Sequence, residues 1–484
     1  MFKLAQSRHV SAPLAVKTLD WDDSTPALFA HLAHLPWALL LDSADAPHED
    51  ARRDLICANP VASLSATETE AHLWHSDAVF EATLPATLAC TDPLALLEQM
   101  QTALFPHAKP CSASPFAGGA AGAFSYDLGR TIEKLPSRAK DDIALPLMNI
   151  GFYDWVLVHD YDSNNWTLVH YLGEAALNET LSWLESLRSQ TEPVPDNFKL
   201  TRPFAKQISF EQYRQKFDAV QSYLHSGDCY QINLTQRFSA GFEGDSWQAY
   251  QALRRANGAP FSAFMRLPQG SILSISPERF IRLDGRKIQT KPIKGTLPRQ
   301  QDPALDAKAA ETLKASPKDR AENLMIVDLL RNDMGKVASP GSVRVPSLFA
   351  IESFPAVHHL VSTVEAELAE GQSAASLLRA AFPGGSITGA PKIRAMEIIE
   401  ELEPSRRSLY CGSMGYLSQS GAMDTSITIR TLVAADGEIH CWAGGGVVAD
   451  SVVESEYQES FDKVSRILPL LERFLAPDAR SEAR

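Results

Sequence analysis

Two carboxylates and an amine recur at helical spacing near the C-terminal end of the sequence. Projected as a helix at ~100° per residue, residues 455–475 place Glu456, Glu459 and Lys463 within an arc of roughly 60°. A surface ion pair between Glu459 and Lys463 would explain this spacing without any function. The two carboxylates would also suit a hard cation such as Mg2+, which binds through one or two carboxylates together with an anionic substrate.

A third carboxylate, Glu322, lies at the start of residues 321–333, which are apolar around nearly the whole circumference of the helix that they predict. We therefore expect this helix to be buried. An acid in the first turn is favourable in itself, because it lies near the positive end of the helix dipole. The alternative is that Glu322 is an acid in a cleft or a metal ligand, and with Glu456 and Glu459 it would make a site for Mg2+.

Lys294 has the most constrained surroundings of the candidate residues. In KPIKGTLPR, residues 291–299, it follows a Pro-Ile pair and precedes a glycine. Lysines in turns are commonly hydrated and have no chemical role. The local sequence alone leaves open whether Lys294 differs from them.

Two glycine-rich segments offer unhindered backbone N–H groups. In residues 382–404 a glycine loop leads into a predicted helix with Pro391 near its first position, and residues 441–451 contain three consecutive glycines. Either segment could hold a carboxylate or a phosphate, although glycine pairs mostly mark turns. Neither has the spacing of a Walker A loop or a Rossmann fingerprint, so we expect neither ATP nor NAD as a ligand.

Periodicity predicts the elements that must position these residues. Residues 209–227 predict a helix that opens with a capping box between Ser209 and Gln212 and stops at Gly227. The alternation in residues 229–238 predicts a half-buried strand with Gln231 on its polar face, where a solvated side chain is commoner than a ligand. Residues 455–475 predict one continuous amphipathic helix.

Composition limits the classes of partner. The chain of 484 residues is 45% hydrophobic and 21% charged, which is typical of a globular protein, and its formal net charge of −14 disfavours nucleic acids and anionic membranes as partners. The first residues do not resemble a secretion signal, and the longest apolar stretch is too short to span a membrane. We expect a soluble, cytoplasmic protein.

The six cysteines are scattered without a Cys-x-x-Cys pair, so we predict neither a disulfide framework nor a structural zinc site. A proline-rich polar segment, 188–206, is the one credible linker. It predicts an N-terminal region of residues 1–187, a second domain of residues 207–475 and a short tail of residues 476–484.

Seven short motifs occur in the order found in chorismate-utilising enzymes, and the sequence resembles this family over about residues 205–475. The motifs are SPERF (276–280), PIKGT (292–296), DRAENLMIVDLLRND (319–333), GGSITGAPK (384–392), SITIR (426–430), AGGG (443–446) and EYQESFDK (456–463). The first 190 residues resemble the family's N-terminal region more weakly. The resemblance implies an α+β fold in which two large antiparallel sheets pack together with helices outside.

The resemblance also implies roles for individual residues. Glu278 would be the general acid that helps to expel the C4 hydroxyl of chorismate, and Glu322, Glu456 and Glu459 would hold the Mg2+ that grips the ring carboxylate. The pocket for the substrate's carboxylates would comprise Tyr410, Arg430, Gly445, Gly446 and Lys463, with Thr296 and His359 lining the site. Because chorismate is a dianion and the chain is acidic, this pocket must reverse the local field.

Lys294 and Gln231 separate the branches of the family. Members that form anthranilate generally carry alanine at position 294, whereas lysine there is similar to the members that form 4-amino-4-deoxychorismate through a covalent lysine adduct at C2. Such a nucleophile must be neutral, so we expect Lys294 to have a lowered pKa. Members that add water place a lysine base at position 231, and an amide such as Gln231 cannot deprotonate water.

The resemblance implies two further ligands. The chain contains no recognisable glutaminase nucleophile, so a separate glutamine amidotransferase subunit would supply ammonia. Residues 35–45 partly resemble the tryptophan-binding segment of the family, which makes Ser43 a candidate for such a pocket. Two alternatives to the aminodeoxychorismate branch are an anthranilate-forming enzyme and a catalytically silent chorismate-binding subunit, although Glu278 and the candidate metal carboxylates are all present.

Overall fold

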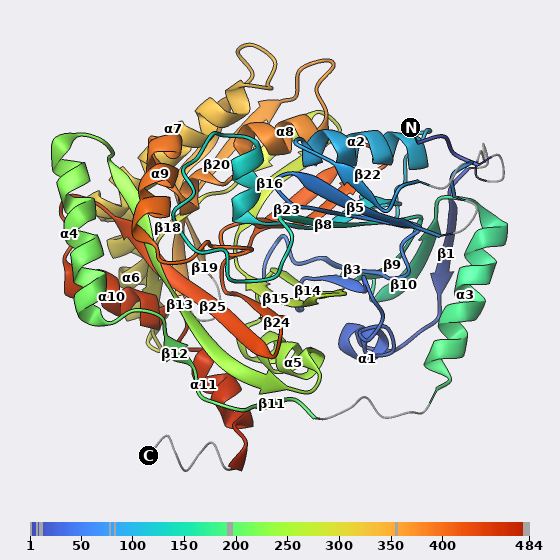
Figure 1. Cartoon of the computed structure of the whole chain (residues 1–484), viewed down its shortest axis with the longest axis horizontal. Coiled ribbons are helices and arrows are strands. Elements are labelled where there is room, and N and C mark those ends of the chain that lie inside the picture. Colours follow the sequence, from blue (N-terminus) through green and yellow to red (C-terminus); the bar gives the residue numbers. More distant parts are fainter. Residues whose placement is uncertain are drawn as a thin grey trace.

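Antiparallel strands dominate the computed structural model of the protein, which describes residues 2–5, 8, 13–76, 79–81, 84–190, 197–353 and 357–477. In this part of the chain the strands form two large sheets, and helices lie around them (Figure 1). The predicted α+β architecture with two large antiparallel sheets is therefore confirmed.

The first sheet crosses the molecule from β1 to β13. Its spatial order is β1 (Ala15–Leu19), β10 (Asn165–His170), β9 (Trp155–Asp160), β3 (Arg53–Cys57), β2 (Leu39–Asp42), β14 (Phe261–Leu267), β15 (Gly270–Ser276), β24 (Thr431–Ala435), β25 (Glu438–Val447), β13 (Gln231–Glu243) and β11 (Lys199–Leu200). Two short strands, β12 (Ala205–Lys206) and β21 (Gly389–Ala390), also pair with β13.

The second sheet begins at the strand that carries Lys294. Its spatial order is β18 (Ile293–Pro298), β20 (Val357–Glu367), β17 (Lys287–Thr290), β16 (Arg279–Asp284), β23 (Met423–Ile427), β22 (Ser413–Ser418), β7 (Gly119–Phe124), β8 (Met148–Tyr153), β4 (Ala62–Ala66), β5 (Glu70–His75) and β6 (Thr87–Ala89). The strand β19 (Arg344–Ser353) pairs with β20.

Helices cover the outer faces and ends of the sheets. They are α1 (Thr25–Ala30), α2 (Pro93–Leu104), α3 (Glu174–Arg188), α4 (Phe210–Ser226), α5 (Ser246–Asn257), α6 (Pro303–Ala315), α7 (Pro317–Gly335), α8 (Ala374–Ala381), α9 (Lys392–Leu402), α10 (Val453–Asp462) and α11 (Leu468–Leu471). Short 3-10 turns lie at η2 (Tyr126–Thr131), η3 (Gly385–Ile387) and η4 (Glu472–Phe474). No helix in the described ranges is both long and apolar enough to cross a bilayer.

The first sheet is buried on both faces. Along β14, Ala263 and Met265 belong to the core between the two sheets, whereas Phe264 belongs to a second core beneath α1, α3, α5 and α11. This alternation follows from the opposite directions of successive side chains in a strand. A third core lies between β13 and the helices α4 and α9.

Strands from both sides of the predicted linker share both sheets. In the first sheet β2 pairs with β14, and in the second sheet β7 pairs with β22. The described residues of the linker include β11 and β12, which pair with β13. Residues 191–196 of the linker and 478–484 of the tail lie outside the described residues, and the predicted boundaries remain predictions.

The helix α4 agrees with its prediction, whereas the strand β13 is more buried than its sequence indicates. The capping box and the left-handed Gly227 at the ends of α4 are confirmed, because both depend on local sequence. The expected half-buried strand β13 is wrong: Gln231 is 1% exposed because its amide packs against Gly446 of β25, whereas Tyr230 is 68% exposed.

Two helix predictions are also wrong. The helix α7 starts at Pro317 behind the N-cap Ser316, so Glu322 is not in its first turn, and its Leu324 side chain is 46% exposed because only one face packs on the sheet. The expected continuous C-terminal helix stops at Asp462 and resumes at Leu468. Pro469 explains this break, because its ring clashes with the carbonyl group four residues earlier in a helix.

Candidate active site

A serine that the sequence analysis did not single out joins the candidate nucleophile to the candidate acid. The Lys294 Nζ donates to the Ser386 backbone oxygen at 3.0 Å, and the Ser386 Oγ donates to the Glu278 Oε1 at 3.1 Å. Glu278 lies between β15 and β16, directly before the first residue of β16, and is 5% exposed. The structure therefore places an amine and a carboxyl group on either side of one residue.

A β-bulge directs Lys294 away from the sheet. Strand β18 pairs Ile293 with Val361 and Thr296 with His359, so three steps along β18 match two along β20. The extra residue accompanies a φ of +83° at Gly295, which a glycine adopts without strain. A Cβ at Gly295 would lie 2.8 Å from the Asp319 Oδ1, so the turn also packs closely against α7.

Burial shifts the two reactive groups toward their neutral forms. Burial lowers the pKa of Lys294, and the neighbouring ammonium of Lys463 lowers it further, while Glu322 opposes both. Burial likewise raises the pKa of Glu278 against the opposing effect of Lys294 and the Ser386 hydrogen bond. A neutral amine can act as a nucleophile and a protonated carboxyl can act as an acid.

Gln231 lies at the beginning of β13 with its amide against the glycine strand. It is 1% exposed, and a Cβ at Gly446 would lie 1.9 Å from its Nε2. Its Oε1 has no hydrogen-bond partner in the described part of the chain. The site thus contains a buried acceptor without a donor, which is costly unless a ligand or water supplies one.

The two carboxylates of α10 converge over Gly445. A Cβ at this glycine would lie 2.9 Å from the Glu459 Oε1 and 3.1 Å from the Glu456 Oε2. The Glu456 Oε1 accepts from the Ser451 Oγ at 2.7 Å, but its buried Oε2 has no hydrogen-bond partner among the described residues. Burial raises the pKa of Glu456, and the nearby Glu459 raises it further.

Two lysines and Glu322 complete the surroundings of these carboxylates. The Lys463 Nζ lies 2.5 Å from the Glu459 Oε1 and donates to the Gly444 oxygen at 2.7 Å, while the Lys318 Nζ is 3.9 Å from the Glu456 Oε1. Burial alone would raise the pKa of Glu459, but the neighbouring Lys463 lowers it, and the net shift is downward. Glu322, whose pKa burial raises, interacts electrostatically with Glu456 and Lys294.

The donor set is compatible with Mg2+. The described residues contain no group of three or more His, Cys, Asp or Glu side chains that could hold a metal ion without other ligands. Mg2+ usually keeps several waters and binds through one or two carboxylates and the substrate, so it does not need such a cluster. The orphaned Oε2 of Glu456 and the convergence with Glu459 provide hard oxygen donors.

The remaining predicted residues lie around the same region. The Thr296 Oγ1 and the His359 Nδ1 are 2.8 Å apart, and burial together with Arg430 lowers the pKa of His359 to about 4, so the imidazole is neutral near pH 7. The Tyr410 ring stacks on the Trp442 ring, with the two ring centroids 5.9 Å apart. Arg430, at a φ of +50°, interacts electrostatically with Tyr410 and Glu278, and in the described chain its guanidinium makes no hydrogen bond or ion pair.

Comparisons with known proteins identify the family of the chain. A family model described as chorismate binding enzyme matches residues 38–469. The chain belongs to this family. Aminodeoxychorismate synthase component 1 of Escherichia coli is 55% identical over 95% of this chain and 99% of its own, and that of Salmonella typhimurium is 54% identical over 94% and 98%. The crystal structure of anthranilate synthase component I from Streptococcus pneumoniae matches with a TM-score of 0.76, 30% identity and coverage of 86% and 92%.

In this chorismate-binding enzyme, buried side chains hold the loop that carries Ser386 through hydrogen bonds. The Ile387 oxygen accepts from the Arg407 guanidinium at 3.0 Å and from the Asn233 Nδ2 at 3.1 Å, and Arg407 is itself paired with Glu403. From the sequence, this segment was predicted to offer free backbone N–H groups and was one of the seven family motifs, but no role was assigned to Ser386. Ser386 was missed because a serine after two glycines is equally typical of a turn.

The candidate tryptophan-pocket residue lies apart from these groups. Ser43 is buried directly after β2, where its Oγ donates to the Arg53 oxygen at 2.6 Å and its N–H donates to the Asp54 Oδ1 at 2.7 Å. Burial and the nearby Asp42 raise the pKa of Asp54 to about 7. The role of Ser43 in tryptophan binding stays a prediction.

The close contact between Gly446 and Gln231 gives a direct prediction. Gly446→Ala should reduce turnover of chorismate by at least about 10-fold, because the new methyl group must displace the buried amide of Gln231. Steady-state kinetics measures the loss. Gly335→Ala, which meets open space at the end of α7, should leave turnover unchanged. Equal rates for Gly446→Ala and wild type would show that the placement of Gln231 is unimportant.

Proposed function

We propose that the protein is the chorismate-converting component of an aminodeoxychorismate synthase. It would combine chorismate with ammonia to give 4-amino-4-deoxychorismate and water, on the route to 4-aminobenzoate and folate. The observation that carries the proposal is the buried, pKa-lowered amine of Lys294 linked through Ser386 to Glu278. Relatives that are 54% and 55% identical and are named aminodeoxychorismate synthase component 1 support the same function.

The proposed reaction begins with the neutral amine of Lys294. It attacks C2 of chorismate while the C4–O bond breaks, and Glu278 gives the departing hydroxyl a proton so that it leaves as water. The geometry supports this pairing, since both groups contact Ser386. The resulting adduct has a bond between Nζ and C2, and Glu278 is left ionised.

Ammonia completes the exchange. Its nitrogen bonds to C4, the Nζ–C2 bond breaks to restore the free lysine, and a proton from the new ammonium group returns to Glu278. The unpartnered Oε1 of Gln231 can accept a hydrogen bond from the incoming ammonia. An amide does not serve as a base for water, which disfavours addition of water to C2.

The other residues would bind the two carboxylates of chorismate. Arg430 has a guanidinium free for a bidentate contact, and Lys463 with the backbone of Gly445 and Gly446 faces the candidate metal carboxylates. Tyr410, Thr296 and His359 would line the pocket. Mg2+ bound by Glu322, Glu456 and Glu459 would supply positive charge against the ring carboxylate.

A second subunit would supply the ammonia. The relatives are named component 1, which indicates a further component, and a glutamine amidotransferase has the required chemistry. We place both subunits in the cytoplasm, because folate precursors are made from soluble metabolites. Tryptophan binding near Ser43 is also part of the proposal.

Product analysis tests the function. Incubation with chorismate, Mg2+ and high ammonium should yield 4-amino-4-deoxychorismate, identified by chromatography against a standard and by conversion to 4-aminobenzoate with a lyase. Anthranilate as the main product would assign the chain to the other amine-adding branch. Recovery of unchanged chorismate under these conditions would favour a silent binding subunit.

Removal of the nucleophile is the second test. Lys294→Ala should keep its fold but show no covalent adduct by intact-mass measurement after incubation with chorismate in the absence of ammonia. The wild-type protein should show the adduct. An equal adduct on both proteins would place the nucleophile elsewhere.

The metal assignment predicts a separation between activity and stability. Glu322→Gln should reduce Mg2+-dependent turnover by at least about 10-fold. The melting temperature at pH 7 should be unchanged or higher, because the folded state raises the pKa of Glu322 and ionisation of this group therefore opposes folding at pH 7. Glu311→Gln on the exposed side of α6 is the matched control. An unaltered response of Glu322→Gln to Mg2+ concentration would remove Glu322 from the site.

A further inference from the structure

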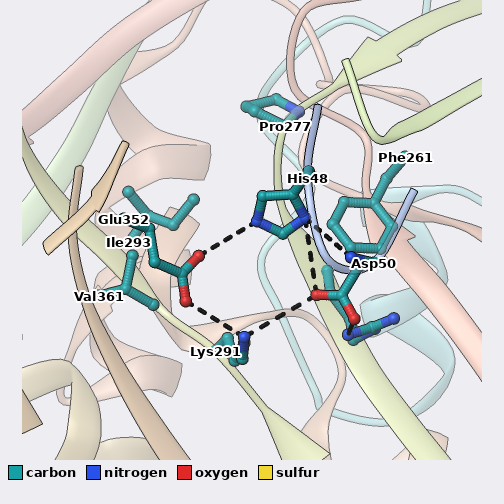
Figure 2. A pocket seen from close by; sticks show the side chains of 9 residues that line it. His48, Asp50, Phe261, Pro277, Lys291, Ile293, Glu352 and Val361 are labelled. Carbon is teal, nitrogen blue, oxygen red and sulfur yellow. Dashed lines mark hydrogen bonds and ion pairs between the residues drawn. The ribbon is translucent and has the colours of Figure 1, made fainter. Parts of the chain in front are cut away.

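Close to Lys294, polar and charged side chains from distant parts of the chain form a ring. Figure 2 shows the carboxylates of Asp50 and Glu352 alternating with His48 and Lys291 around a small pocket. The Lys291 Nζ lies 3.1 Å from the Glu352 Oε1 and 3.9 Å from the Asp50 Oδ2. The His48 Nε2 lies 3.3 Å from the Glu352 Oε2, and its Nδ1 lies 3.9 Å from the Asp50 Oδ2.

The pocket inside this ring is too small for a substrate. Its volume of about 10 Å³ has room for roughly one water molecule. Phe261, Pro277, Ile293 and Val361 supply apolar walls (Figure 2). The carboxylates of the ring are already paired with cations of the chain, so a structural role explains the arrangement better than ligand binding does.

The ring is attached to both reactive groups through the backbone. Lys291 precedes Lys294 by three positions and lies just before the bulge of β18. Asp50 also forms an ion pair with Arg279 at 2.8 Å, and Arg279 directly follows Glu278. The Asp50 carboxylate, from the loop between β2 and β3, therefore contacts both Arg279 next to Glu278 and Lys291 near Lys294.

The bulge makes such an attachment necessary. Lys294 and Gly295 fall between the two matched pairs of the β18–β20 ladder, so the ladder does not fix the position of the amine. On the C-terminal side of the bulge, Arg299 pairs with Asp306 at 2.7 Å. On the N-terminal side, Lys291 contacts Glu352 and also forms a short ion pair with Glu49.

We propose that the ring of His48, Asp50, Lys291 and Glu352, together with Arg279, is a positioning device that sets the spacing between Lys294 and Glu278. This inference rests on the proposed function. The side chains of Lys291 and Asp50 are 14% and 13% exposed, so removal of one charge leaves its partners partly buried and uncompensated. The segments that carry the amine and the acid then lose their common anchor.

The test compares Lys291→Met with a matched lysine on the preceding strand. Lys291→Met should lower kcat for 4-amino-4-deoxychorismate between about 10-fold and 100-fold, because an error of about 1 Å in the reacting groups has this effect. The KM for chorismate should change little, since the residues proposed to bind its carboxylates lie elsewhere. The rate of adduct formation in a single turnover should fall in parallel with kcat.

Two further variants separate positioning from general stability. Lys287→Met removes the 2.8 Å ion pair between Lys287 of β17 and Glu365 of β20 and should leave kcat unchanged. Lys291→Arg keeps the charge and should restore most of the kcat. Melting temperatures are recorded for all variants, and the kinetics are measured well below them.

Each outcome decides between the alternatives. Wild-type kcat in Lys291→Met, or an equal loss of kcat in Lys287→Met, would overturn the positioning role. If Lys291→Met does not fold, Asp50→Asn replaces it with the same expected fall in kcat and the same overturning result. Failure of the wild-type protein to form the product would contradict the proposed function instead, so the two failures are distinguishable.

Discussion

The candidate site depends on the burial of one lysine amine among carboxylates. Desolvation disfavours the ammonium form of Lys294, whereas Glu322, Glu278 and Glu459 favour it, and the net effect is a lowered pKa. If the carboxylates dominated, the lysine would stay protonated and could not attack carbon. In the proposed function, positive charge from Mg2+ and Lys463 would weaken the effect of the carboxylates and so favour the neutral amine.

The two sheets bring the parts of this balance together. The amine and the acid come from segments beside β18 and β16 in the second sheet, while Gln231 and the glycines come from β13 and β25 in the first. Glycine is required at position 446, because the Gln231 side chain lies against the backbone there. A Cβ at Gly446 would lie 1.9 Å from the Gln231 Nε2. The loop that carries Ser386 then joins the two sides of the site.

Local signals were predicted well from the sequence, and nonlocal ones were not. The capping box of α4 depends on residues three positions apart and could be identified, as could the carboxylate pair of α10. The burial of Gln231 could not, because it depends on Gly446 of β25, which comes much later in the chain. The ring around Lys291 was equally hidden, since its members His48 and Glu352 lie 304 positions apart. The break before α11 could have been predicted from Pro469.

The most direct test of the account is a titration of Lys294 itself. With lysines labelled at Cε, the NMR signal that disappears in Lys294→Ala identifies the residue, and its chemical shift is followed against pH. The account predicts a midpoint clearly below the usual lysine value of about 10.4. A midpoint at or above that value would contradict it, because the amine would then be an ordinary ammonium ion at the pH where the enzyme works.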